Sequence, residues 1–100
     1  ILLLEAFGKK IDKITLQQYD RHLQDILEKE FDGKKLDFTS FDSKMQVEFI
    51  LRDSFKLTEQ NIYCREYSQT VEYLGEIISH IGVSCRKDGR WQNLNMLTNK

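Results

Sequence analysis

The sequence contains no proline and only five glycines among its 100 residues. Flexible linkers rich in these residues are therefore excluded. A chain of this length supports one hydrophobic core, so we expect residues 1–100 to form a single domain. The longest apolar run covers only Ile1–Leu4. A membrane-spanning helix needs about 20 apolar residues, so the sequence predicts no membrane partner.

Cysteine is also scarce, because the chain holds only Cys64 and Cys85. Two cysteines without a CxxC pair do not indicate a disulfide scaffold, and we interpret both as small buried side chains in an intracellular, cytoplasmic or nuclear, compartment. Together with His22 and His80 they form no zinc motif, so we expect no metal ion and no cofactor. The first residue is Ile and not Met, so we expect either a processed product or a fragment of a longer protein.

Motifs for catalysis are missing as well. No Ser or Cys lies in a recognisable nucleophile motif beside a base, so we expect no catalytic residues and a non-catalytic protein. The segment Asp37–Glu48 has some acidic residues at calcium-loop spacing, but Asp42 stands where that loop needs glycine. Calcium binding there is excluded. Hydrophobic residues make up 40% of the chain and charged residues 31%, a balance typical of a folded globular domain.

The spacing of apolar residues predicts several helices. Thr15 and Gln18 match a capping box, so a helix should begin near Leu16, after a separate helical segment over Ile1–Lys10. We expect Gly33 to end it. Its apolar stripe is Leu16, Tyr19, Leu23, Ile26 and Leu27.

Three further helices follow from the same reasoning. We expect them from about Ser43 to Phe55, from Thr58 to about Arg65, and over Gln69–His80. The buried stripe of the last one is Val71, Leu74, Ile77, Ile78 and Ile81. The segment Leu36–Phe38 fits either a short strand or an extended connector.

The end of the chain predicts a β-hairpin, because Asp88-Gly89 suits the positive φ angles of a two-residue turn. Counting back from this turn pairs Lys87 with Arg90, Arg86 with Trp91, Cys85 with Gln92, Ser84 with Asn93 and Val83 with Leu94. We expect the helices to cover the face that carries Val83, Cys85 and Leu94. Trp91 and Arg86 would then face outward. The predicted fold class is mainly α with a small C-terminal β-hairpin (α+β).

The order of these elements, above all in the stretch SQTVEYLGEIISHIGVSCRKDGRW, resembles a winged helix-turn-helix domain. The resemblance covers residues 38–94 as a winged-helix-like core and leaves residues 1–35 as an N-terminal helical extension. It implies a transcription or replication regulator whose last helix reads DNA and whose hairpin contacts the DNA backbone. The residues concerned are Gln69, Thr70, Glu72 and Tyr73 on the helix, and Arg86, Lys87 and Arg90 on the hairpin.

The charge pattern favours a protein partner over DNA. The expected reading helix carries Glu72 and Glu76 and no Lys or Arg, whereas residues 81–100 hold four Lys and Arg residues against one acidic residue. We therefore predict an interaction module that docks a protein partner or a neighbouring domain, with Trp91 as an anchor beside Arg86. Nucleic-acid binding and a structural domain of a larger enzyme are the alternatives. The Arg86–Trp91 pair could equally serve only to steady the hairpin.

Overall fold

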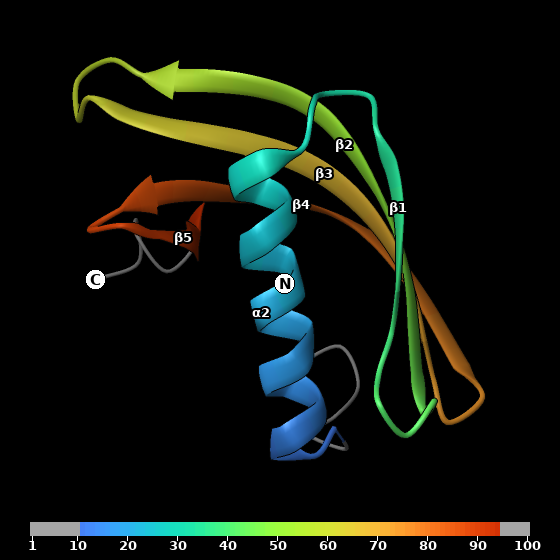
Figure 1. Cartoon of the computed structure of the whole chain (residues 1–100). Coiled ribbons are helices and arrows are strands. Elements are labelled where there is room, and N and C mark those ends of the chain that lie inside the picture. Colours follow the sequence, from blue (N-terminus) through green and yellow to red (C-terminus); the bar gives the residue numbers. More distant parts are fainter. Residues whose placement is uncertain (1–10, 95–100) are drawn as a thin grey trace.

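The computed structural model describes residues 11–94, which form one helix and a five-stranded antiparallel sheet (Figure 1). The elements are α2 (Lys13–Lys29), β1 (Lys35–Thr39), β2 (Met45–Leu57), β3 (Ile62–Tyr73), β4 (Glu76–Lys87) and β5 (Arg90–Asn93). Each strand pairs with the next along the chain, so the order in space is β1-β2-β3-β4-β5. The helical segment predicted over residues 1–10 lies outside the described residues.

The fold is mainly β, so the predicted mainly-α class and the winged helix-turn-helix resemblance are wrong. The segment expected to be helical from Ser43 to Phe55 lies largely in β2, and the one from Thr58 to Arg65 crosses into β3. The expected reading helix, Gln69–His80, runs through the end of β3, a turn and the start of β4. No helix within residues 11–94 is long and apolar enough to cross a membrane.

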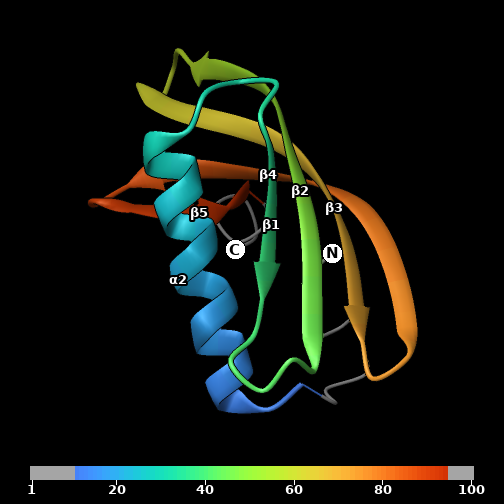
Figure 2. The ribbon, with the colours of Figure 1, turned by 45° about the vertical axis from the view of Figure 1, so that its right-hand side comes forward.

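The sheet curves around α2, which covers its inner face (Figures 1 and 2). Side chains alternate between the two faces of a strand, and β2 shows this clearly. Its buried residues, Met45, Val47, Phe49 and Leu51, point inward, and the residues between them point to the outer face. The inner face packs on Tyr19, Leu23, Ile26 and Leu27 of α2, which together with it form the hydrophobic core.

The predicted apolar stripe of α2 is confirmed, but the helix begins at Lys13 and not near Leu16. Asp12 is the N-cap, since its carboxylate accepts a hydrogen bond of 2.8 Å from the backbone N–H of Thr15. The helix ends at Lys29, before Gly33. Beyond that end, the chain turns and enters β1, which confirms the strand alternative for Leu36–Phe38.

Two hairpins at β4 use the same kind of two-residue turn. Asp88 and Gly89 have φ angles of 55° and 76°, and the predicted pairing of Ser84–Lys87 with β5 is confirmed. Leu74 and Gly75, which join β3 to β4, have φ angles of 51° and 85°. Leucine rarely adopts positive φ, so this second turn carries no sequence signal of the Asn-Gly type.

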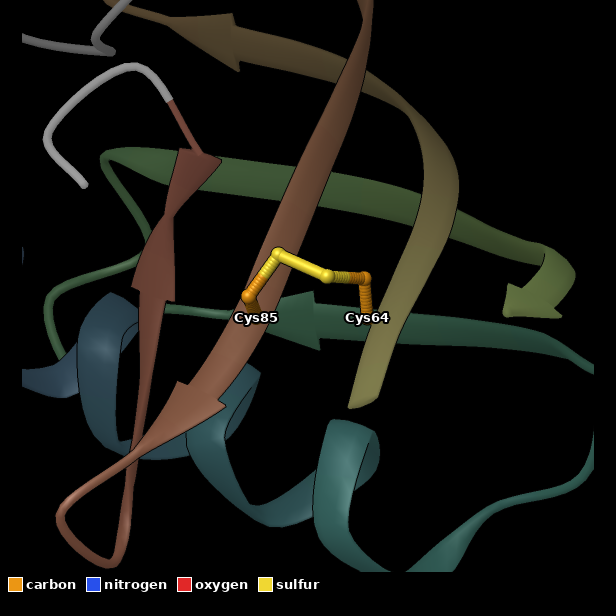
Figure 3. Close-up of a disulfide and its surroundings, with 2 residues drawn as sticks. All are labelled: Cys64 and Cys85. Carbon is orange, nitrogen blue, oxygen red and sulfur yellow. A yellow bond between two sulfur atoms is a disulfide. The ribbon is translucent and has the colours of Figure 1, made fainter. Parts of the chain in front are cut away.

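Cys64 of β3 and Cys85 of β4 lie directly opposite each other and form a disulfide (Figure 3). Both residues are fully buried, as predicted, but the bond between them was not predicted. The sequence did not indicate the bond because the partners are 21 residues apart. The predicted helix over Gln69–His80 also excluded the β3–β4 pairing that sets the two cysteines opposite each other. The disulfide ties β3 to β4 next to the β4–β5 hairpin.

Candidate functional site

The residues predicted to read DNA from one helix lie instead on both faces of β3. Gln69 and Tyr73 are buried on the inner face, whereas Thr70 and Glu72 are exposed on the outer face. A strand separates neighbouring side chains in this way because successive residues point to opposite sides. The structure therefore does not bring these residues together as one surface.

The hairpin packs on α2 with the opposite face from the one predicted. We expected Trp91 to face solvent, but it is only 8% exposed and belongs to the core. Its indole Nε1–H donates to Glu28 Oε1 at 2.9 Å, and the Arg86 guanidinium reaches the same oxygen at 2.9 Å. α2 thus covers the face that carries Arg86 and Trp91, because its polar side supplies partners for both.

Gln24 and Asp20 of α2 complete this contact. The Gln24 side-chain amide accepts a hydrogen bond from Trp91 N–H at 2.9 Å and donates one to the Trp91 carbonyl at 2.6 Å, as a neighbouring strand would. Arg90 forms an ion pair with Asp20. Arg86, Arg90 and Trp91 of the predicted binding surface are therefore engaged within the molecule, while Lys87 is exposed at the hairpin turn.

A polar cluster also lies inside the fold, beneath α2. The Tyr19 hydroxyl donates to Gln69 Oε1 at 2.7 Å, and Gln69 Nε2 lies 3.4 Å from the His80 ring. Burial raises the pKa of Tyr19 and lowers the pKa of His80, so both are neutral near pH 7. This cluster satisfies the polar atoms of Gln69 within the core. Among the described residues, no group of His, Cys, Asp and Glu has the arrangement of a metal site.

The outer face of β4 carries large apolar side chains in solvent. Ile77 is 65% exposed and Ile81 is 59% exposed. Both had been predicted to lie in the buried stripe of a helix. In the sheet they lie four residues apart on the same face, with Ser79 midway between them and Val83 following. Exposed isoleucines in a row on one strand are a candidate contact surface.

The backbone of β4 is also open along this segment. β5 pairs with β4 only from Ser84 onward, so within residues 11–94 no strand pairs with the outer edge of Ile77–Val83 (Figure 2, where β4 forms the right-hand border of the sheet). An unpaired strand edge presents a row of N–H and C=O groups. We name the segment Ile77–Val83 the open edge.

The hairpin geometry shows which of these groups point outward. Tyr73 and Glu76 close a two-residue turn, so they form a hydrogen-bonded pair, and such pairs alternate with non-hydrogen-bonded ones along an antiparallel ladder. Counting onward, Ile78, His80 and Gly82 bond to β3. The backbone groups that point away from β3 belong to Ile77, Ser79, Ile81 and Val83. The short Cα–Cα distance of 3.9 Å at Cys64–Cys85 fits the same alternation.

A second apolar patch surrounds the start of α2. Phe41 is 92% exposed and Ile14 is 67% exposed, and both line a shallow hollow with Asp12, Lys13 and Asp42. This patch offers exposed side chains but no row of unpaired backbone groups. The open edge therefore offers both apolar side chains and unpaired backbone groups, whereas the hollow offers side chains alone.

Comparisons with protein-family models, curated protein sequences and solved structures gave no match. The functional argument therefore rests on the geometry of the described residues. One signal in the sequence could have indicated the open edge. Tyr67, Gln69, Val71 and Tyr73 alternate with Ser68, Thr70 and Glu72, and this period of two marks a strand. A strand that ends at Tyr73 implies a turn at Leu74-Gly75 and a second strand that begins near Glu76.

Proposed function

We propose that this domain is a non-catalytic protein-binding module that adds an extended strand of a partner protein to the open edge of β4. The observation that carries the proposal is the coincidence of outward backbone groups with Ile77 and Ile81, both mostly exposed, on one strand. Proteins usually protect a strand edge with charged side chains, proline or a bulge. The open edge has no Lys, Arg, Asp, Glu or Pro.

Strand addition divides recognition between backbone and side chains. The main-chain hydrogen bonds supply affinity for any extended segment, and the side chains beside them select the sequence. Ile77 and Ile81 favour a partner strand with β-branched or aromatic residues on the same face, since such cross-strand pairs are each worth roughly 0.2–1 kcal/mol. The preferred partner is thus an extended segment with alternating apolar residues.

The disulfide supports this use of β4 and indicates where the module acts. It ties the end of β4 to β3 at Cys85, two residues after the open edge, so the strand is held in place before a partner arrives. Disulfides persist in oxidising compartments and are rare in the cytosol and nucleus. We therefore place the module in an oxidising compartment and not in the cytoplasm or nucleus.

The alternatives have less support from the geometry. DNA binding was inferred from a reading helix that the fold lacks, and Arg86 and Arg90 face carboxylates of α2 that offset their charge. The idea of a structural domain within a larger enzyme has no counterpart among the described contacts. Neither alternative is developed further.

A library of random 12-residue peptides, displayed on phage and selected against the oxidised protein, tests the proposal. We expect enriched peptides with alternating β-branched or aromatic residues. Ile81→Lys should weaken their binding about tenfold or more, because a charge replaces an apolar contact of about 1.5–3 kcal/mol. The control is Ile50→Lys, which places the same change on the outer face of β2, away from the open edge.

Ile50→Lys should leave peptide affinity within about twofold of the unchanged protein. Selection of no peptides by the folded protein would overturn the proposed function. Equal losses in both variants would also overturn it, because binding would then not depend on β4.

A further inference from the structure

We infer that the open edge pairs with the same edge of a second copy of this chain, antiparallel and centred on Ser79. This inference rests on the proposed function, because it names the partner strand that the open edge accepts. It follows from the order of residues along Ile77–Val83 and from the direction of their backbone groups.

The backbone fits its own copy in this register. With Ser79 opposite Ser79 of the second copy, Ile77 lies opposite Ile81 of the second copy, and the reverse pair follows by symmetry. All of these residues have outward N–H and C=O groups, so each pair can exchange two hydrogen bonds. A shift of one residue would set outward groups against residues already bonded to β3, and the ladder could not form.

The side chains single out the same register. Directly opposite residues of an antiparallel pair lie on the same face, so each exposed isoleucine would cover the other on the outer face. A shift of two residues in one direction sets Ile81 against Ser79 and Ile77 against Val83. A shift of two residues in the other direction sets Ile77 against Ser79 and Ile81 against Gly75, so in neither case does one exposed isoleucine face the other. The register centred on Ser79 is therefore the one that covers Ile77 and Ile81 together, which are 65% and 59% exposed in the single chain.

Charge does not oppose the pairing. His80 is the only ionisable residue of the open edge, and its ring points to the inner face toward Gln69. Burial lowers its pKa below the ordinary value of 6.5, so the imidazole is neutral at pH 7. Within the open edge itself, the pairing therefore brings no like charges together.

Cysteine cross-linking tests the register directly. In the inferred pairing the two Ser79 Cα atoms lie about 5.5 Å apart, within the range that a disulfide can bridge. Ser79→Cys should therefore give a covalent dimer on mild oxidation. The control is Val83→Cys, on the same face of the same strand, whose symmetry mate lies roughly eight residues further along, or about 27 Å away.

Sedimentation velocity over a range of concentrations supplies the second measurement. We expect the unchanged protein to dimerise, Ile50→Lys to dimerise equally, and Ile81→Lys to dimerise at least about tenfold more weakly, because each dimer loses two apolar contacts. A monomer at every concentration, or cross-linking of Val83→Cys as readily as of Ser79→Cys, would overturn the inference.

The two proposals fail in different ways. If the protein selects peptides that lose binding in Ile81→Lys but remains a monomer, self-pairing is wrong and the strand-binding function stands. If neither peptides nor a second copy bind, both proposals are wrong.

Discussion

Glu28 shows how one residue of α2 determines which face of the hairpin is buried. Its carboxylate accepts hydrogen bonds from both the Trp91 indole and the Arg86 guanidinium. A tryptophan that packs against the core needs a partner for its N–H, and Glu28 supplies it. The nearby Gln24 amide holds the Trp91 backbone, so the indole is fixed from two positions of the same helix.

Glu28 also gives the stability of the protein a predictable dependence on pH. The hydrogen bonds from Arg86 and then Trp91 hold the pKa of Glu28 below its ordinary value of 4.5. A lowered folded-state pKa stabilises the fold above the unfolded-state pKa, and this contribution is lost as the pH falls through the folded-state value. Glu28→Gln removes the charge and hence this dependence.

We therefore predict that the difference in free energy of unfolding between the unchanged protein and Glu28→Gln is constant from about pH 7 to 5 and shrinks below about pH 4. Urea titrations at several pH values measure it. Asp12 and Asp32 also have lowered pKa values, but they are common to both proteins and cancel in the difference. The control is Glu59→Gln, an exposed change in the β2–β3 turn. A difference independent of pH would contradict this role of Glu28.

At the level of elements, α2 was predictable because its pattern fits only a helix. Ile26 follows Leu23 at the third position, and Leu27 follows it at the fourth. This spacing places all three on one side of a helix but on both sides of a strand. The last hairpin was predictable from Asp88-Gly89, whose positive φ angles the turn requires.

The remaining strands were mistaken for helices for a definite reason. Met45 and Phe49 are four residues apart, and this spacing keeps two side chains on one face of a helix and equally on one face of a strand. The intervening Val47 continues the alternation of apolar residues, which is the pattern of a strand. The Leu74-Gly75 turn then hid the boundary between β3 and β4, because an exposed leucine at positive φ is no turn signal.

The candidate site depended on these missed strands. Ile77 and Ile81 were recognised as one apolar face, but their exposure follows from pairing in a sheet whose inner face α2 already covers. The inward position of Trp91 likewise depends on Gln24 and Glu28, which are far from it in sequence. Spacing along one chain does not reveal which face a distant helix will cover.

The Cys64–Cys85 disulfide is predicted to contribute strongly to the β3–β4 pair. It closes a loop with a sequence separation of 21 residues, for which the chain-entropy estimate is about 3 kcal/mol. The double change Cys64→Ala, Cys85→Ala should therefore lower the free energy of unfolding by about that amount in urea titrations. The same loss should appear in the unchanged protein under a reductant, which serves as the internal control.

The reductant should have no effect on the double variant. A loss well under about 1 kcal/mol in both experiments would contradict the stabilising role of the bond. A loss in the variant alone would instead point to the packing of the alanine side chains.

At the level of the whole fold, the one helix within residues 11–94 covers one face of the five-stranded sheet, and no other element of this range covers the opposite face (Figure 1). Buried inner-face residues hold the layers together, and the most exposed isoleucines of the sheet, Ile77 and Ile81, lie on the outer face of β4. The two edge strands of the sheet are β1 and β5. Because β5 has only four residues, it leaves much of the outer edge of β4 uncovered. The outer edge of β1 is unpaired as well, but it carries Lys35 and Asp37, whereas the unpaired edge of β4 carries the exposed Ile77 and Ile81.

The most direct test of this account is amide hydrogen exchange of β4, followed residue by residue by NMR at low and high protein concentration. We predict that Ile78, His80 and Gly82 are protected at both concentrations, since they bond to β3. Ile77, Ser79 and Ile81 should exchange rapidly in the dilute protein and become protected in the concentrated one. Equal protection of all these amides in the dilute protein would contradict the account, because the edge of β4 would then already be covered within a single chain.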